Sequence, residues 1–127
     1  MKYAIEFDNN HLLYKRSFNG KINMSDIVEA WGMLIDDKDF VESDCPLVSD
    51  YRNAELLMNV DAINQALRFY DSKKEVLKGR KHAVLVEKPR QTALALLFKR
   101  SHDESQGMLF NLFEEEQEAL RWINEKG

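Results

Sequence analysis

The sequence predicts an α/β domain built on a mostly parallel sheet, and three features of the chain support this fold class. Apolar and polar residues alternate through "KYAIEF" and "LLYKRSF", which is typical of strands with one buried face. From Met24 onward, apolar residues recur three and four positions apart, which is typical of amphipathic helices. "HAVLVE", residues 82–87, is apolar on both faces, as the central strand of a parallel sheet is.

The first two strands are expected to pair as an antiparallel hairpin. "DNNH" lies between them, and asparagine tolerates the left-handed backbone conformation that a tight turn requires. Gly20 is expected to end the second strand. The apolar faces of the two strands consist of Tyr3, Ile5 and Phe7 in the first and Leu12, Tyr14 and Phe18 in the second.

The first helix is expected to begin at Met24 and to extend through Ile35, with Asn23 or Ser25 as its N-cap. Gly32 within this helix costs about 1 kcal/mol relative to alanine. A close approach of another backbone at Gly32 would offset that cost.

The rest of the chain continues to alternate strands with helices. A short buried strand begins at Leu47, and a helix follows from about Val60 to Gly79. After the strand at 82–87, "TALALLF" predicts a third helix, "MLFNLF" a last strand and "EEEQEALRWINEK" a last helix. The predicted order is ββαβαβαβα, with right-handed crossovers between the parallel strands.

The composition fits one globular domain spanning residues 1–127, with 44% hydrophobic and 31% charged residues. A net charge of -4 and a pI near 5.4 disfavour nucleic-acid binding. The basic stretch "KKEVLKGRKH" is interpreted as a helix C-terminus rather than a phosphate-binding patch. Cys45 is the single cysteine, and no run is long and apolar enough to span a bilayer. A cytoplasmic protein without stable membrane insertion is therefore expected.

No catalytic residue, metal site or cofactor is predicted. His11, His82 and His102 have no motif partner, and the chain contains no HExxH, Gly-x-Ser-x-Gly or P-loop sequence. "DDKD", residues 36–39, lacks the ligand count and the glycine of a calcium loop. The glutamates before the last helix favour a helix start, where acidic side chains complement the dipole, over a metal site.

A polar cluster of Asp50, Tyr51, Arg52 and Asn53 is the candidate ligand-binding site. These residues are expected at the carboxyl end of the third strand, the edge at which open α/β sheets usually bind ligands. The alternative is structural. Asp50 would then accept nearby backbone N–H groups, Arg52 would pair with a carboxylate and Tyr51 would pack in the core.

The order of elements, "LVSDYRNAE" closing the third strand, "HAVLV" before a helix and "LFEEEQEALRWI" at the end together resemble the STAS-like domains. These are the SpoIIAA-like proteins, named for the anti-sigma-factor antagonists, and the chain looks most like their small stand-alone bacterial branch. The resemblance covers essentially the whole chain. It implies a scaffold that binds another protein, and the fold is also similar to the lipid-binding CRAL-TRIO domains.

The same resemblance disfavours a sigma-factor switch. In the antagonists, a serine after the third strand is phosphorylated by the partner kinase. The corresponding stretch here, "LMNVDAI" at residues 57–63, has no hydroxyl group, and Asn59 is expected to cap the helix that follows.

Three functional hypotheses follow. The first is a non-enzymatic binding or regulatory domain that acts on a protein partner or as a homodimer. The second is a carrier of a small apolar or anionic, lipid-like ligand, with Arg52 binding the anionic group and the "TALALLF" helix forming an apolar wall. The third, a hydrolase using Asp50 and His82, is least favoured, because the two residues are expected near opposite ends of neighbouring strands.

Overall fold

The computed structural model describes residues 2–102 and 107–125 and has the predicted α/β architecture. Five strands form one sheet in the order β1-β2-β3-β4-β5. β1 and β2 are antiparallel, and the remaining neighbours are parallel, so the predicted N-terminal hairpin forms one edge. The strands are β1 (Tyr3–Asp8), β2 (Leu13–Ile22), β3 (Leu47–Leu56), β4 (Lys81–Leu85) and β5 (Leu109–Phe113).

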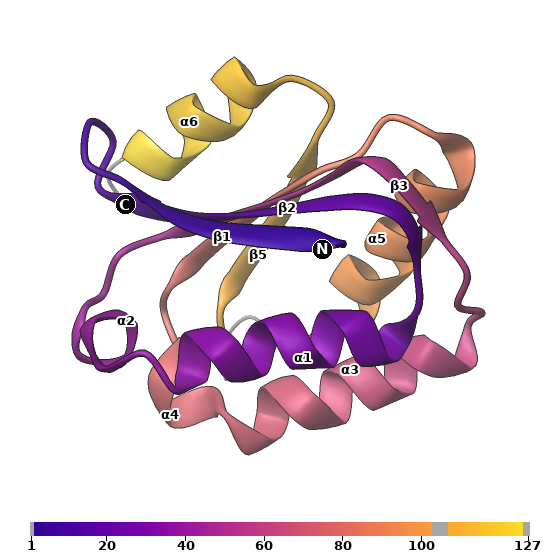
Figure 1. Ribbon diagram of the computed structural model, residues 1–127, viewed down its shortest axis with the longest axis horizontal. Coiled ribbons are helices and arrows are strands. Elements are labelled where there is room, and N and C mark those ends of the chain that lie inside the picture. The colour runs from indigo at the N-terminus through magenta and orange to yellow at the C-terminus, as the bar shows by residue number, and fades with distance from the viewer. Residues whose placement is uncertain (1, 103–106, 126–127) are drawn as a thin grey trace.

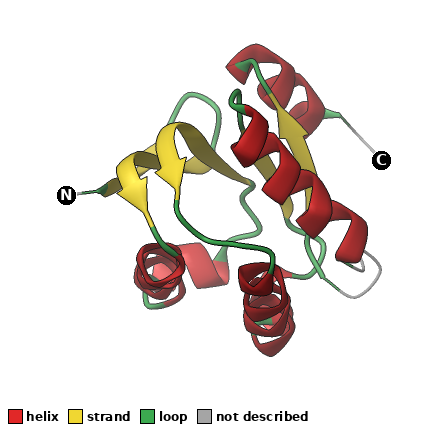
Figure 2. Cartoon of the chain, turned by 90° about the vertical axis from the view of Figure 1, so that its right-hand side faces the viewer, coloured by secondary structure: helices red, strands yellow, loops and turns green. Residues whose placement is uncertain are grey.

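The helices cover both faces of the sheet (Figure 1 and, turned by 90°, Figure 2). α1, α3 and α5 pack on one face, over the larger apolar core, and α6 covers the other face over a smaller core. Two short helices, α2 and α4, lie next to the ends of α1 and α3. The helices are α1 (Met24–Ile35), α2 (Lys38–Glu42), α3 (Asp61–Ser72), α4 (Lys74–Leu77), α5 (Pro89–Ser101) and α6 (Glu116–Asn124).

Local capping explains where several elements begin. Asn23 caps α1 as predicted, since its side chain accepts a hydrogen bond from Asp26 N at 3.0 Å and the Asp26 carboxylate accepts one from Asn23 N at 2.9 Å. The Asp8 carboxylate accepts the N–H groups of Asn10 and His11 in the hairpin turn. The left-handed residue of that turn is Leu12, with a φ of 54°, rather than an asparagine.

The second strand is longer than predicted. Gly20 does not end it: this residue lies inside β2 with a φ of 76°, a conformation that glycine adopts without strain, and the strand continues to Ile22. Pairing with β3 shifts just before Gly20, because β2 advances from Ser17 to Asn19 while β3 advances from Asp50 to Asn53. This β-bulge reverses the inward and outward alternation of β3.

The third strand also differs from the prediction. β3 extends from Leu47 to Leu56, so the candidate cluster at residues 50–53 lies within the strand and not at its carboxyl end. The long β2 provides hydrogen-bonding partners for the whole of β3, whereas β4 pairs with β3 only as far as Asp50. The second half of β3 therefore has one free edge, which α5 covers.

The helical predictions need three corrections. The helix expected from Val60 to Gly79 is divided at Lys73 into α3 and α4, and Gly79 follows with a φ of 78°. α2 was not predicted; the Asp37 carboxylate caps it by accepting the N–H of Asp39 at 2.9 Å. Among the described residues, no backbone from outside α1 approaches Gly32, since a Cβ placed there would meet none of their atoms within 4 Å.

Candidate functional site

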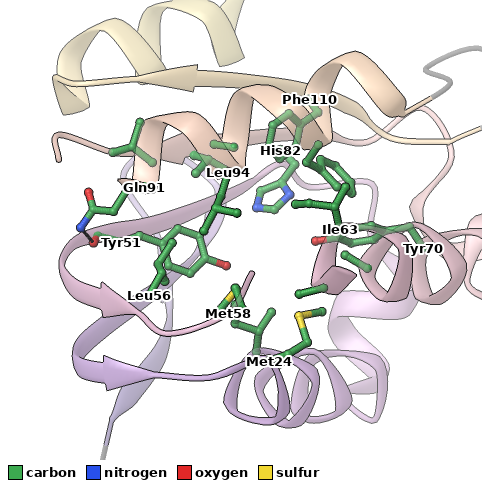
Figure 3. A pocket seen from close by; sticks show the side chains of 17 residues that line it. Met24, Tyr51, Leu56, Met58, Ile63, Tyr70, His82, Gln91, Leu94 and Phe110 are labelled. Carbon is green, nitrogen blue, oxygen red and sulfur yellow. Dashed lines mark hydrogen bonds between the residues drawn. The ribbon is translucent and has the colours of Figure 1, made fainter. Parts of the chain in front are cut away.

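An apolar cavity of about 80 Å³ lies between the sheet and helices α1, α3 and α5 (Figure 3). β3 and β4 form its floor, from His82 near the start of β4 to Leu56 at the end of β3, and the segment after β3 contributes a further wall. The carboxyl end of parallel strands is the edge at which open α/β sheets usually bind ligands. Apolar side chains that line the cavity include Met24, Leu56, Met58, Ile63, Val86 and Leu94.

Small side chains on the covering helices leave this space open. Ala62 and Ala66 of α3 and Ala95 of α5 face the cavity, at positions where larger residues would fill it. The wall from α5 matches the apolar surface expected for "TALALLF", because Leu94 and Phe98 lie four residues apart on one face.

Polar groups at the cavity come mainly from three aromatic residues. Tyr51 of β3, Tyr70 of α3 and His82 of β4 line it. Figure 3 shows the two hydroxyl groups and the nitrogen-bearing edge of His82 directed toward the same interior space. All three side chains are largely enclosed, and burial raises the pKa of both tyrosines, so that both stay protonated at neutral pH.

Behind these residues lies a buried polar network centred on Arg16 of β2. The Arg16 side chain donates to Ser49 Oγ from Nε at 3.0 Å and from Nη2 at 2.9 Å. Nη2 also lies 3.4 Å from Tyr51 Oη, and Ser49 Oγ lies 2.7 Å from His82 Nε2. The guanidinium is 0% exposed and lies 4.2 Å from the centre of the Trp31 ring.

This network determines the tautomer of His82. Ser49 Oγ uses its acceptor capacity on Arg16, so the Ser49 hydroxyl proton is donated to His82 Nε2. Burial, and then the charge of Arg16, lower the pKa of His82 well below its usual value, so the ring is neutral. The ring proton is therefore on Nδ1, which has no hydrogen-bond partner among the described residues.

Arg16 differs from the other buried arginine, Arg80. The Arg80 guanidinium donates to four backbone carbonyls, and those of Phe40, Ser43 and Cys45, at 3.1, 2.7 and 2.9 Å, fix the segment after α2. Arg16 contacts no carbonyl in this way, and within residues 2–102 and 107–125 no carboxylate lies within 4.0 Å of it. A buried, uncompensated cation is costly and is typical of functional sites.

Gln91 of α5 joins the free edge of β3 to the helix beside the cavity. Its side-chain amide donates to the carbonyls of Tyr51 at 2.7 Å and Ala54 at 2.6 Å, and its carbonyl accepts the N–H groups of Glu87 and Lys88. One buried side chain thus satisfies four backbone groups. Neither Gln91 nor Arg16 was identified as a site residue from the sequence.

The predicted site residues Asp50, Tyr51, Arg52 and Asn53 do not form one site. Arg52 is paired with Asp50 through Nε and Nη2, each at 3.0 Å, on the face covered by α6. This is the pairing with a carboxylate that the structural alternative expected for Arg52. Asn53 is exposed beyond the bulge, and Tyr51 alone lines the cavity.

A signal for the missed network was present in the sequence. Arg16 lies between Tyr14 and Phe18 in the alternation of β2, at a position that faces the core. Ser49 and His82 occupy equivalent inward positions in β3 and β4. A polar residue at an apolar position of a strand is the pattern that indicates a buried polar site.

Three other kinds of functional feature are relevant: a metal site, a membrane-spanning helix and the Asp50 and His82 pair. Within the described residues, there is no group of three or more His, Cys, Asp or Glu side chains that could bind a metal ion. No helix in those parts of the chain combines the length and the apolar character needed to cross a membrane. His82 and Asp50 lie three positions apart along neighbouring strands, because His82 is in register with Leu47 and Leu85 with Asp50.

Comparison with known proteins identifies the fold. No protein-family model matches the chain, and no curated protein matches it. A solved structure is similar: an uncharacterised protein of the DUF3478 family with a SpoIIAA-like fold, from Shewanella loihica PV-4. The TM-score is 0.63 at 15% sequence identity, covering 95% of this chain and 91% of that one. The protein therefore has a SpoIIAA-like fold, as its resemblance to the STAS-like domains implied.

Proposed function

We propose that this protein is a non-enzymatic binding protein whose ligand is a small apolar molecule held in the cavity between the sheet and α1, α3 and α5. One observation supports this function above others: the cavity has apolar walls and extends to the carboxyl ends of parallel strands, where open α/β sheets usually bind ligands. This function corresponds to the carrier hypothesis, with the ligand on the opposite side of β3 from Arg52.

The size of the cavity restricts the ligand. Its volume of about 80 Å³ is smaller than the ~150 Å³ apolar cavity that takes up one benzene molecule. A ligand of a few heavy atoms fits this space, as does the end of a longer chain that enters from the segment after β3.

The arrangement of Ser49 supports binding rather than nucleophilic catalysis. Its hydroxyl lies 2.7 Å from His82 Nε2, as in a nucleophile and base pair, but Ser49 is 0% exposed and does not line the cavity. A molecule in the cavity would meet His82 before it reached Ser49. Arg16, which donates twice to Ser49 Oγ, further fixes this hydroxyl in a structural role.

A regulatory domain that binds a protein partner, or itself as a homodimer, is the second candidate. Leu57 and Val60, in the segment between β3 and α3, are 51% and 62% exposed and lie next to the cavity. Exposed apolar side chains at a loop favour a contact surface. Cys45, a free thiol, supports a cytoplasmic location for either function.

Thermal-shift assays with a panel of small apolar compounds, combined with native mass spectrometry of freshly purified protein, test the leading function. A ligand that binds only the folded protein raises the melting temperature, and the rise grows with the ratio of ligand concentration to Kd. Ala95→Leu fills the cavity and should abolish the shift, whereas Ala93→Leu, an exposed position on the same helix, should preserve it. No shift and no bound mass would contradict the proposal.

A self-associating or partner-binding domain gives a different result. Sedimentation velocity would then detect a dimer that Leu57→Ser and Val60→Ser dissociate, with no effect of Ala95→Leu. A monomer at every concentration would exclude the homodimer.

A further inference from the structure

Three of the polar groups at the cavity, those of Tyr51, Tyr70 and His82, are hydrogen-bond donors without an acceptor among the described residues, whereas the fourth, Gln91, is satisfied by backbone groups. Tyr70 Oη accepts from Trp31 Nε1 at 3.0 Å, and Tyr51 Oη lies 3.4 Å from Arg16 Nη2, so each hydroxyl oxygen already has a donor. Within the described residues, neither phenolic proton is donated to an acceptor. His82 adds its Nδ1–H, which is likewise unpartnered there.

A buried donor without an acceptor is unfavourable, because the group has lost its hydrogen bond to water. Three such donors facing one small space are unusual for a cavity that serves only as a packing defect. Apolar packing defects are lined by aliphatic and aromatic carbon and need no polar occupant. The donors around this cavity are complementary to an occupant that carries an acceptor group.

We propose that the cavity binds a short-chain carboxylate, with its oxygens accepting hydrogen bonds from Tyr51, Tyr70 and His82 and its alkyl chain against Met24 and Met58. This inference rests on the proposed function and adds the chemical class of the ligand. Figure 3 shows the geometry that supports it, since the three donors and the two methionines lie on opposite sides of the same space.

The charge of Arg16 selects an anion over a neutral acceptor or a cation. The guanidinium is fully buried, and the described part of the chain provides no carboxylate within 4.0 Å of it. Arg16 contacts Tyr51 directly and reaches His82 through Ser49. A ligand carboxylate would therefore lie one hydrogen-bonded residue away from an uncompensated positive charge, which stabilises it in a medium of low dielectric constant.

The volume sets the chain length. A cavity of about 80 Å³ is smaller than the ~150 Å³ engineered cavity that takes up one benzene molecule. Butyrate, with four carbons and two oxygens, has as many non-hydrogen atoms as benzene and is therefore used as the upper limit of chain length. Longer carboxylates would extend past Met58 toward the surface.

The test compares three four-carbon compounds that differ only in the polar group: butyrate, butan-1-ol and butan-1-amine. Binding is followed by the methyl resonances of Met24 and Met58, both of which line the cavity. Butyrate should bind at least about tenfold more tightly than the alcohol, as expected for a charge-assisted hydrogen bond, and the amine should bind most weakly. Equal affinities of butyrate and butan-1-ol would overturn the inference.

Removal of single hydroxyl groups provides matched variants. Tyr51→Phe and Tyr70→Phe should each weaken butyrate binding by about tenfold and leave xenon binding, which needs only apolar walls, unchanged. Tyr14→Phe is the control, because Tyr14 is buried but does not line the cavity. Equal butyrate affinity in the wild type and both variants would also overturn the inference.

Xenon separates the two proposals. If xenon shifts the Met24 and Met58 resonances but butyrate is not preferred, the carboxylate inference is wrong and the apolar-ligand function stands. If neither xenon nor any four-carbon compound binds, the proposed function is wrong as well.

Discussion

Replacement of Gln91 by leucine is predicted to destabilise the protein strongly. Gln91 is 1% exposed and joins the free edge of β3 to the start of α5, where Arg90 Nε also donates to the Leu56 carbonyl at 2.7 Å. Leucine has a similar size but cannot donate or accept. The carbonyls of Tyr51 and Ala54 would remain buried without their donors, and two N–H groups at the start of α5 would lose their acceptor.

The magnitude follows from the two buried carbonyls. Each buried polar group left unpaired costs about 1–3 kcal/mol, and the half-buried N–H groups of Glu87 and Lys88 recover part of their bonding from water. The free energy of unfolding should fall by about 3 kcal/mol. For a domain of this size, that is a large part of the total stability.

Urea denaturation followed by circular dichroism measures this loss. Gln65→Leu is the matched control, because Gln65 is exposed on α3 and its replacement should change the free energy of unfolding by less than about 0.5 kcal/mol. If Gln91→Leu destabilised the protein no more than Gln65→Leu, the role assigned to Gln91 would be refuted.

Three further predictions concern stability and pH. Burial alone would raise the pKa of Asp50, but the hydrogen bonds from Arg52 outweigh it and lower that pKa. Asp50→Asn should therefore reduce the free energy of unfolding by about 1–2 kcal/mol at neutral pH. The difference between this variant and the wild type should disappear as the pH falls through the acid range below about 4. Burial lowers the pKa of His82, so stability present above about pH 6.5 should decrease as the pH falls below it. NMR of the ring should still detect the neutral form below about pH 6.5, where an exposed histidine is already mostly protonated. Gly32→Ala should stabilise the protein by about 0.5–1 kcal/mol, because its Cβ meets no neighbour; thermal denaturation would contradict this if the melting temperature fell.

Much of the fold was predictable because it depends on local periodicity. The alternation of Tyr14 with Phe18 and the helical spacing after Met24 each indicate one element and most of its buried face, although Leu12, also expected on that face, lies in the hairpin turn and is 61% exposed. The capping side chain of Asn23 could be identified in the same way. These features need no knowledge of distant contacts.

The candidate site was less predictable because it depends on pairing between distant parts of the chain. The bulge in β3, which places Tyr51 inward and Asn53 outward, arises only from the register with β2. The Trp31 Nε1 to Tyr70 Oη hydrogen bond joins residues 39 positions apart on two helices. No local pattern specifies such a contact.

Arg52 illustrates the limit of a polar cluster as a signal. Four consecutive polar or aromatic residues suggested one site, yet side chains alternate across a strand, so Arg52 and Tyr51 face opposite sides of the sheet. Asp50, two residues away on the same face, is the partner that this alternation provides for Arg52.

An NMR titration with xenon, on protein labelled at its methionine methyl groups, tests directly whether the cavity binds ligands. Met24 and Met58 line the cavity, whereas Met33 is 51% exposed on α1 and serves as an internal control. If the cavity is an accessible apolar binding site, the Met24 and Met58 resonances should shift saturably and that of Met33 should not. Unchanged Met24 and Met58 resonances, or an equal and linear drift of all three, would contradict the claim that this cavity binds ligands.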